Sequence, residues 1–340
     1  MSGTARSAPA ARILGAATLG LTILTALDLL RRRRVSAPAA AAVPRPASTR
    51  RDDGRSPAGP GQRPAPRSAQ ARIGSLDAAS QAGRSLHASA ALLAGSVLLD
   101  SGLEHYRGRF ANPGMAAPLV TASLTVAAGV QGSRGGGRLA NDEVYALAMA
   151  AGVAGTLFHA YNLLRRPGGL SWGNLFYAAP LGAPAALTLA GLLGLAARRS
   201  GEPILGIGSG RAVCALAAGG LAGSSAEAAL LHFRGAYHHP AMWLPVSVPP
   251  VAAALLAGAA IAPRRAPRRL ARGWLAVTAA LGAAGVAFHA YGIARSMGGW
   301  RNWSQMILQG PPLPAPPGFT GVALAGLGAL QLLEHPEEER

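Results

Sequence analysis

Four histidines recur as two pairs along the chain, and histidine is a residue type that binds both haem iron and transition metals. The pairs are His105 with His159 and His232 with His289. Two histidines on facing helices supply both axial ligands of a b-type haem. Imidazole also binds iron, copper, manganese or zinc when carboxylates complete the ligand set. The residue types therefore predict cofactor chemistry of one of these two kinds.

Charged residues accompany the histidines. Asp100 precedes His105 by five residues, and Glu227 precedes His232 by five. Both acids lie inside apolar segments, where a carboxylate is costly and needs a partner. The candidate metal ligands are therefore the four histidines with Asp100 and Glu227. Arginines near the histidines are candidates for charge-assisted bonds to haem propionates; they are Arg107, Arg234, Arg165 and Arg295.

The histidines belong to a sequence that occurs twice. Residues 105–118 match 232–245 at six of fourteen positions, which are a His, an Arg, a Gly, two Pro and a Met. Phe-His-Ala-Tyr at 158–161 recurs at 288–291. Each copy continues with an Arg, a Gly-Gly pair, a Trp and a Pro-Leu-x-Ala-Pro sequence. We interpret this self-similarity as a tandem duplication.

Eight apolar segments position these residues. Each is close to the ~20 residues that a helix needs to cross the hydrocarbon core. Gly, Ala and Ser dominate them, as is typical of membrane helices that approach closely. A soluble helical bundle would show a polar stripe on each helix, and these segments lack one. The segments are 86–105, 114–131, 143–161, 174–197, 212–232, 241–262, 273–293 and 315–334.

The sequence thus predicts an all-α integral membrane protein with an N-terminal anchor helix and two tandem four-helix bundles. The apolar run 13–30, followed by four Arg, places the anchor within residues 1–34; a secretory signal peptide is the disfavoured alternative, because the arginines resist translocation. Residues 35–84 are rich in Ala, Pro and Arg and predict a disordered linker. The two repeats then occupy residues 85–199 and 200–340.

Orientation follows from the arginines. An even number of spans returns the chain to its starting side, so the copies are expected to share one orientation about a pseudo-twofold axis along the membrane normal. Arginine is more frequent in the loops near 132–141, 198–211 and 263–272, which predicts that these loops and the C-terminus face the cytoplasm. The histidines then lie near the periplasmic face. All 32 basic residues are Arg, which favours a bacterial inner membrane protein.

Composition and motifs exclude several classes. Of the 340 residues, 50% are hydrophobic and 14% are charged, against about 25% charged in soluble domains. The net charge of +18 comes from Arg beside apolar segments, so no nucleic-acid partner is expected. The single cysteine, Cys214, excludes an intramolecular disulfide and CxxC motifs. No Walker, Rossmann, GxSxG or HExxH motif is present.

Three functions remain open. The first is a redox subunit that binds haem b through the four histidines, and the second is a carboxylate–histidine metal site. In the third, the histidines and acids are structural, and the chain is a transporter, scaffold or accessory subunit. The expected partners are the lipid bilayer and other membrane or periplasmic redox subunits.

The plan of two tandem four-helix units, each with a histidine pair, resembles that of the haem A synthase family. The resemblance lies in the architecture. That family's loop motifs are not found in this sequence, so no residue role is carried over from it.

Overall fold

The computed structural model describes residues 67–200, 204 and 207–334, and every structural statement below concerns these residues. They are helical, without a β-strand; an isolated bridge joins Ile204 to Ile207. The predicted anchor helix, the linker up to residue 66 and the acidic residues 337–339 lie outside the described part.

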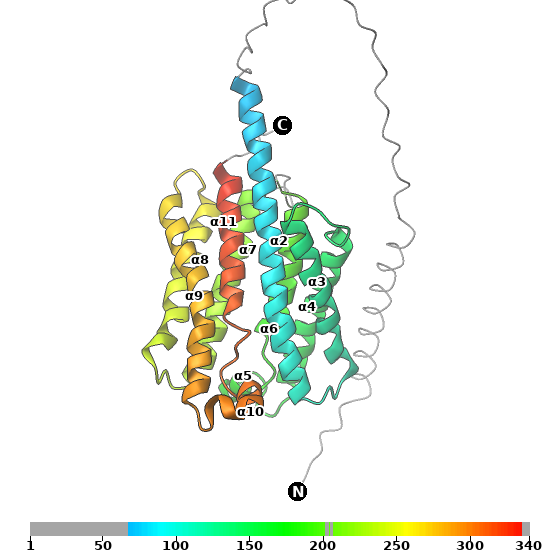
Figure 1. Cartoon of the computed structure of the whole chain (residues 1–340), viewed down its shortest axis with the longest axis vertical. Helices are drawn as coiled ribbons and strands as arrows, with labels where there is room; N and C mark the ends of the chain where they lie inside the picture. Colours follow the sequence, from blue (N-terminus) through cyan, green and yellow to red (C-terminus); the bar gives the residue numbers. More distant parts are fainter. Residues whose placement is uncertain (1–66, 201–203, 205–206, 335–340) are drawn as a thin grey trace, which may run out of the picture.

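The chain folds into long helices joined by short helical turns (Figure 1). Six spans are long and apolar enough to cross a membrane, as expected for a multi-pass membrane protein; they are α2 from Ala79 onward, α3 with η1, α4, α7, α8 with η2, and α9. The elements are α2 (Arg67–Arg107), η1 (Pro113–Ala116), α3 (Ala117–Ser133), α4 (Asp142–Leu164), α5 (Trp172–Tyr177), α6 (Gly182–Arg198), α7 (Ser209–Arg234), η2 (Pro240–Trp243), α8 (Leu244–Ile261), α9 (Arg268–Arg295), η3 (Gly299–Asn302), α10 (Trp303–Gln309) and α11 (Pro317–Glu334).

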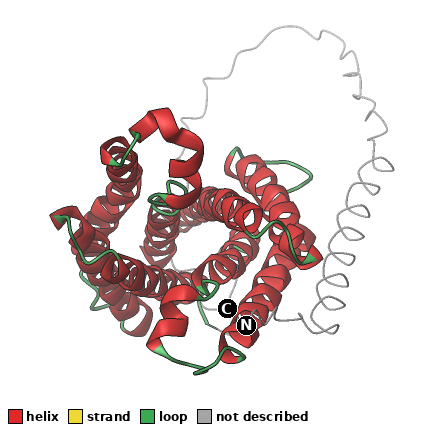
Figure 2. Cartoon of the chain, turned by 90° about the horizontal axis from the view of Figure 1, so that it is seen from below, coloured by secondary structure: helices red, strands yellow, loops and turns green. Residues whose placement is uncertain are grey.

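Four helices form the centre of the molecule. α2 packs against α6 and α11, and α7 packs against the same two helices. The outer helices α3 and α4 lie against α2 and α6, and α8 and α9 lie against α7 and α11. In the view along the helix axes, the helices of both halves form one bundle (Figure 2). The short helices α5 and α10 both lie at its lower end (Figure 1).

Small and aliphatic side chains form one continuous core from both halves of the sequence. Leu86 and Leu93 of α2, Leu187 of α6, Leu221 of α7 and Leu330 of α11 are fully or almost fully buried in it. Close van der Waals packing stabilises the contacts between these helices, and the small Gly and Ala residues permit the close approach. The two predicted repeats therefore share a core in the described structure.

Two serines of α2 join it to the second half. The Ser89 hydroxyl donates to the Gly321 carbonyl at 2.5 Å, and the Ser96 hydroxyl donates to the Pro314 carbonyl at 2.6 Å. Such bonds between membrane helices contribute about 0.6 kcal/mol on average. They fix the register of α2 against α11 and the segment before it.

The segment 174–197 is interrupted, in contrast to the single span that its apolar composition predicted. α5 ends at Tyr177, Ala178 is extended, and α6 begins only at Gly182. Pro180 explains the break, because proline lacks an N–H group and disfavours a helical residue before it. α6 is consequently only 17 residues long, and it is shielded from lipid on several sides by its neighbours.

The linker prediction also needs a correction. Residues 67–84, assigned from composition to a disordered linker, form the beginning of α2. The last proline of the Pro-rich stretch is Pro66, and the following residues include several good helix formers such as Ala, Arg and Gln. Ala82 is fully buried, so packing supports the helix here as well.

Ion pairs gather at the end of the molecule opposite α5 and α10. Asp142, in the first turn of α4, accepts from Arg198 at 3.2 Å and from Arg199 at 2.6 Å. Arg272 pairs with Glu334 at 2.5 Å. The Asn141 side chain caps α4 by accepting from the Val144 amide at 3.0 Å, a favourable start for a helix. This end carries the arginines that predicted the cytoplasmic face.

Candidate functional site

The four predicted histidines lie in the last turns of four long helices. His105 is in α2, His159 in α4, His232 in α7 and His289 in α9. All four are half-buried. These helices end where α5 and α10 lie (Figure 1), so the histidines share one end of the molecule, as their positions along the segments predicted.

Each of these histidines makes the same kind of hydrogen bond. The Nδ1 atoms of His105, His159, His232 and His289 lie 2.6, 2.5, 2.8 and 2.7 Å from backbone carbonyl oxygens. A carbonyl oxygen only accepts, so each Nδ1 must carry the proton and donate it. The neutral ring then has its lone pair on Nε2. All four side chains therefore present an Nε2 atom that can bind a metal.

The accepting carbonyls belong to matched places in the two halves. His105 donates to Met115 of η1, and His232 donates to Met242 of η2. The acceptor of His159 is Pro180, and that of His289 is Pro312; each lies in the chain that leads into α6 or α11. Such carbonyls outside a regular helix are free to accept a side-chain donor.

An unusual backbone turn follows both His105 and His232 and places an aromatic side chain against each imidazole ring. Arg109 and Phe110 have φ of 52° and 47°, and Ala236 and Tyr237 have 57° and 46°. Non-glycine residues rarely adopt this left-handed region. The turn brings the Phe110 ring edge-on to His105, with ring centres 6.3 Å apart, and Tyr237 edge-on to its histidine at 6.1 Å. Backbone and aromatic contacts together orient both imidazoles.

The members of each pair are near one another. His105 and His159 are close enough for their charges to interact, and the same holds for His232 and His289. Convergence of each pair on one cavity within its own half stays a prediction. A shared ligand between the rings remains a prediction.

The two intramembrane acids come from different halves. Asp100 of α2 and Glu227 of α7 are half-buried and lie within range of each other's charge. The Glu227 carboxylate accepts from the Gly182 amide at 3.2 Å, at the N-terminus of α6, where the helix dipole favours negative charge. A Cβ atom on Gly182 would overlap that carboxylate, so glycine is required for the approach.

The partner found for one of the acids is a backbone group. Glu227 accepts from a backbone amide, and Glu104 and Glu227 are carboxylates whose charges act on Asp100 or are acted on by it. No group of three or more His, Cys, Asp or Glu side chains is placed to hold a metal ion among the described residues. The carboxylate–histidine metal site stays a prediction.

The four candidate arginines each have a local partner. Arg107 pairs with Glu104 at 2.5 Å. Arg234 donates to the Phe176 carbonyl at 3.0 Å and lies over the Tyr177 ring. The other two stack on the tyrosine one helical turn earlier; they are Arg165 over Tyr161 at 5.2 Å and Arg295 over Tyr291 at 5.5 Å.

Some residues that sequence reasoning missed are structural. His87 was assigned to no cluster; its Nδ1 lies 2.7 Å from the Tyr145 hydroxyl in the core of the first half. Gly182 gave no sequence signal beyond its place in the repeated Pro-Leu-x-Ala-Pro sequence. Two cavities stand out, one at the end of α2 and one apolar groove between α7 and α8, and neither is lined by any of the four histidines.

Comparisons with protein-family models, with curated proteins and with solved structures find no match to this chain. The functional argument therefore depends on the geometry of the residues themselves.

Proposed function

We propose that the chain is a multi-pass redox subunit of a bacterial inner membrane, with one b-type haem held by a histidine pair in each half near the periplasmic face. One observation carries the proposal. All four recurring histidines donate Nδ1–H to a backbone carbonyl, which leaves every Nε2 free. Histidines that bind metals almost always donate their other ring N–H in this way.

The tandem repeat receives support from conformations that recur at matched positions. The left-handed turn at 109–110 recurs at 236–237, and the Gly-Gly pair at 168–169 and its counterpart at 298–299 both have positive φ. The arginine–tyrosine stacks recur as well. Two copies of one unit, related by an axis along the membrane normal, would produce these matches.

The donor set fits haem better than a directly bound metal ion. Bis-histidine ligation needs two neutral imidazoles and no carboxylate, and each half has such a pair. When bound, haem supplies reversible one-electron transfer. The chain's own contribution is to hold each ring in one tautomer and orientation, since the carbonyl bond and, for His105 and His232, an aromatic edge restrict its rotation. The arginines remain predicted partners of the propionates.

A visible spectrum of the purified full-length chain tests the proposal. Protein produced with haem supplied should show a low-spin spectrum that changes on reduction. The double variant His105→Ala with His159→Ala should lose the fraction of the haem absorbance that comes from the first half. His239→Ala is the matched control at the same end: His239 accepts at Nδ1 from the Ala241 amide, so it has the opposite tautomer. Metal analysis of the same samples detects a directly bound transition metal, the other predicted cofactor.

Two results would reject the proposal. One is a colourless protein under all of these conditions. The other is a spectrum that survives replacement of all four histidines, since the haem would then be held elsewhere.

A transporter is the second candidate, and the placement of Asp100 and Glu227 within range of each other's charge favours it. Ionisable residues inside the membrane mark ion and proton pathways, and transporter sites lie at the interface between repeats. The two acids come from different halves and approach at the centre of the molecule. A change in protonation of this pair could couple to movement of one half against the other.

Solvent access separates the two candidates. Cys214 is buried and is the sole native cysteine, so Asp100→Cys in a Cys214→Ala background gives one reporter thiol. A transporter predicts reaction with a membrane-impermeant thiol reagent from both sides of the membrane. Reaction from one side or from neither contradicts alternating access and leaves the redox proposal.

A further inference from the structure

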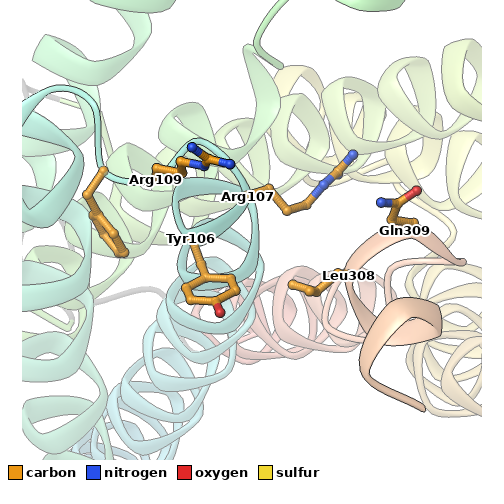
Figure 3. Close-up of a pocket in the computed structure, with 6 residues that line it drawn as sticks. Tyr106, Arg107, Arg109, Leu308 and Gln309 are labelled. Atoms are coloured by element: carbon orange, nitrogen blue, oxygen red, sulfur yellow. The ribbon is translucent and has the colours of Figure 1, made fainter. Parts of the chain in front are cut away.

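A cavity of about 550 Å³ opens between the end of α2 and α10, at the histidine-bearing end of the molecule. Its lining combines charged, polar and apolar side chains from both halves. Arg107 extends from α2 toward Gln309 (Figure 3). The lining residues are Tyr106, Arg107, Arg109, Phe110, Leu308 and Gln309.

The charge of this cavity is positive. Of its two guanidinium groups, that of Arg107 is paired with Glu104, whereas the Arg109 side chain has no hydrogen bond or ion pair with another described residue. The Tyr106 hydroxyl and the Gln309 amide likewise have no hydrogen-bond partner in the described part of the chain. The cavity therefore offers one uncompensated cation and two uncommitted polar groups beside an apolar wall.

The matched place at the end of α7 is closed by side chains of α5, which belongs to the first repeat. There the Phe233 ring stacks on Phe176, with centres 5.7 Å apart and planes 19° from parallel. Arg234 donates to the Phe176 carbonyl and lies over Tyr177. In the repeat alignment Leu308 corresponds to Phe176 and Gln309 corresponds to Tyr177. The cavity beside Tyr106 and Arg107 is therefore lined by a leucine and a glutamine where the matched place has two aromatic residues.

The two halves also differ in charge at this place. Arg109 has the same left-handed conformation as its counterpart Ala236. The cavity at the end of α2 thus lacks the two aromatic side chains that fill the matched place, and it has a guanidinium in addition. The added guanidinium favours an anionic ligand, and the absent aromatic side chains leave room for it. Neither difference is needed to complete the fold, because the matched place at the end of α7 has the opposite residues.

We propose that this cavity binds a phosphate-bearing anion. Guanidinium groups match the geometry of phosphate oxygens through two parallel N–H bonds, and the tyrosine and glutamine add neutral donors. Phe110 and Leu308 give the apolar contact that the carbon portion of the ligand would need. A phospholipid headgroup and a free phosphate compound share this chemistry. The assignment does not depend on haem binding.

The test measures binding by the full-length protein in two arms. In the lipid arm, protein from nanodiscs of phosphatidylglycerol or of phosphatidylcholine is analysed by native mass spectrometry for retained lipid. In the second arm, binding of radiolabelled inorganic phosphate is measured by equilibrium dialysis. Selective retention of phosphatidylglycerol identifies a headgroup, and phosphate binding identifies a free ligand.

Three variants assign the binding to this cavity. Arg109→Ala copies the second half and should weaken binding about tenfold or more, as expected for loss of a charged hydrogen-bonding partner. Leu308→Phe with Gln309→Tyr restores the aromatic filling and should block binding while keeping both arginines. Arg301→Ala removes an exposed arginine of η3 outside the cavity and should bind as the wild type does.

The proposal is overturned if the wild type binds neither probe, or if it retains both lipids equally without binding phosphate. Binding that is unchanged in Arg109→Ala and in the aromatic variant also overturns it, since the anion would then lie elsewhere. Arg109 is exposed, so a folded Arg109→Ala protein keeps the test decisive even if the aromatic variant does not fold.

Discussion

Backbone carbonyls, and not other side chains, set the protonation pattern of the four recurring histidines. A carboxylate partner would also hold Nδ1–H, but it would add negative charge next to a bound cofactor and raise the basicity of the ring. A carbonyl orients the ring while leaving it neutral. The pattern is therefore suited to a ligand whose charge is balanced elsewhere.

The sequence predicted which residues recur but not what they touch. His105 and His232, and His159 and His289, were recognised because their neighbours repeat. Met115 and Met242 repeat as well, yet it is their backbone oxygens that accept, and a backbone contact leaves no trace in residue type. The missed contact between Glu227 and Gly182 has the same cause.

At the scale of single residues, Gly182→Ala should destabilise the protein by about 1–3 kcal/mol. The new Cβ atom would overlap the Glu227 carboxylate and remove its bond to the residue 182 amide. Thermal unfolding in detergent micelles measures the loss. Gly223→Ala on α7 is the matched control, because a Cβ atom there meets nothing within 4 Å.

The interpretation of this variant depends on a double-mutant comparison. In a Glu227→Ala background the Gly182→Ala substitution should cost clearly less, since the overlapping group is gone. Equal costs in the two backgrounds would mean that Glu227 does not occupy the space beside Gly182.

At the scale of the elements, hydrophobicity located six helices that are long and apolar enough to cross a membrane, because length and apolar composition suffice for that. It did not reveal the interruption of the segment 174–197. It did not distinguish central helices from outer ones. α6 and α11 are short and deeply packed between other helices, and this depends on contacts far apart in the sequence. The start of α2 was missed because the composition of residues 67–84 was judged together with that of the Pro-rich stretch before it, which ends at Pro66.

The α2–α11 contact leads to a prediction for helix packing. Replacing both Ser89 and Ser96 by Ala should lower the free energy of unfolding by about 1 kcal/mol, the sum of two ordinary interhelical bonds. Unfolding in mixed micelles at increasing denaturing-detergent content gives the difference. Ser123→Ala changes an exposed serine of α3 and should have no effect; an equal loss in this control would show that hydroxyl removal as such, and not the interface, is responsible.

At the scale of the whole molecule, the distribution of charges and aromatics agrees with one orientation. The ion pairs of Asp142 and Arg272 lie at one end. At the other end four tryptophans are well exposed, as expected of an interfacial aromatic belt; they are Trp172, Trp243, Trp300 and Trp303. The histidines and the cavity at Arg109 share the tryptophan end.

Reporter fusions test this orientation. A fluorescent protein fused to the C-terminus should fluoresce, and alkaline phosphatase fused at the same place should be inactive, because the arginine bias puts that end in the cytoplasm. A second phosphatase fusion after Tyr237, in the loop next to His232, should be active. The reverse pattern would place the histidines on the cytoplasmic side and remove periplasmic redox partners from the proposal.

The number of haems per chain tests the central claim most directly. Two equivalent histidine pairs predict two haems in the wild type, one after His105→Ala with His159→Ala, one after His232→Ala with His289→Ala, and none when all four are replaced. Haem and protein are quantified in the same purified samples. A wild-type chain without haem, or a quadruple variant that retains it, would contradict the account.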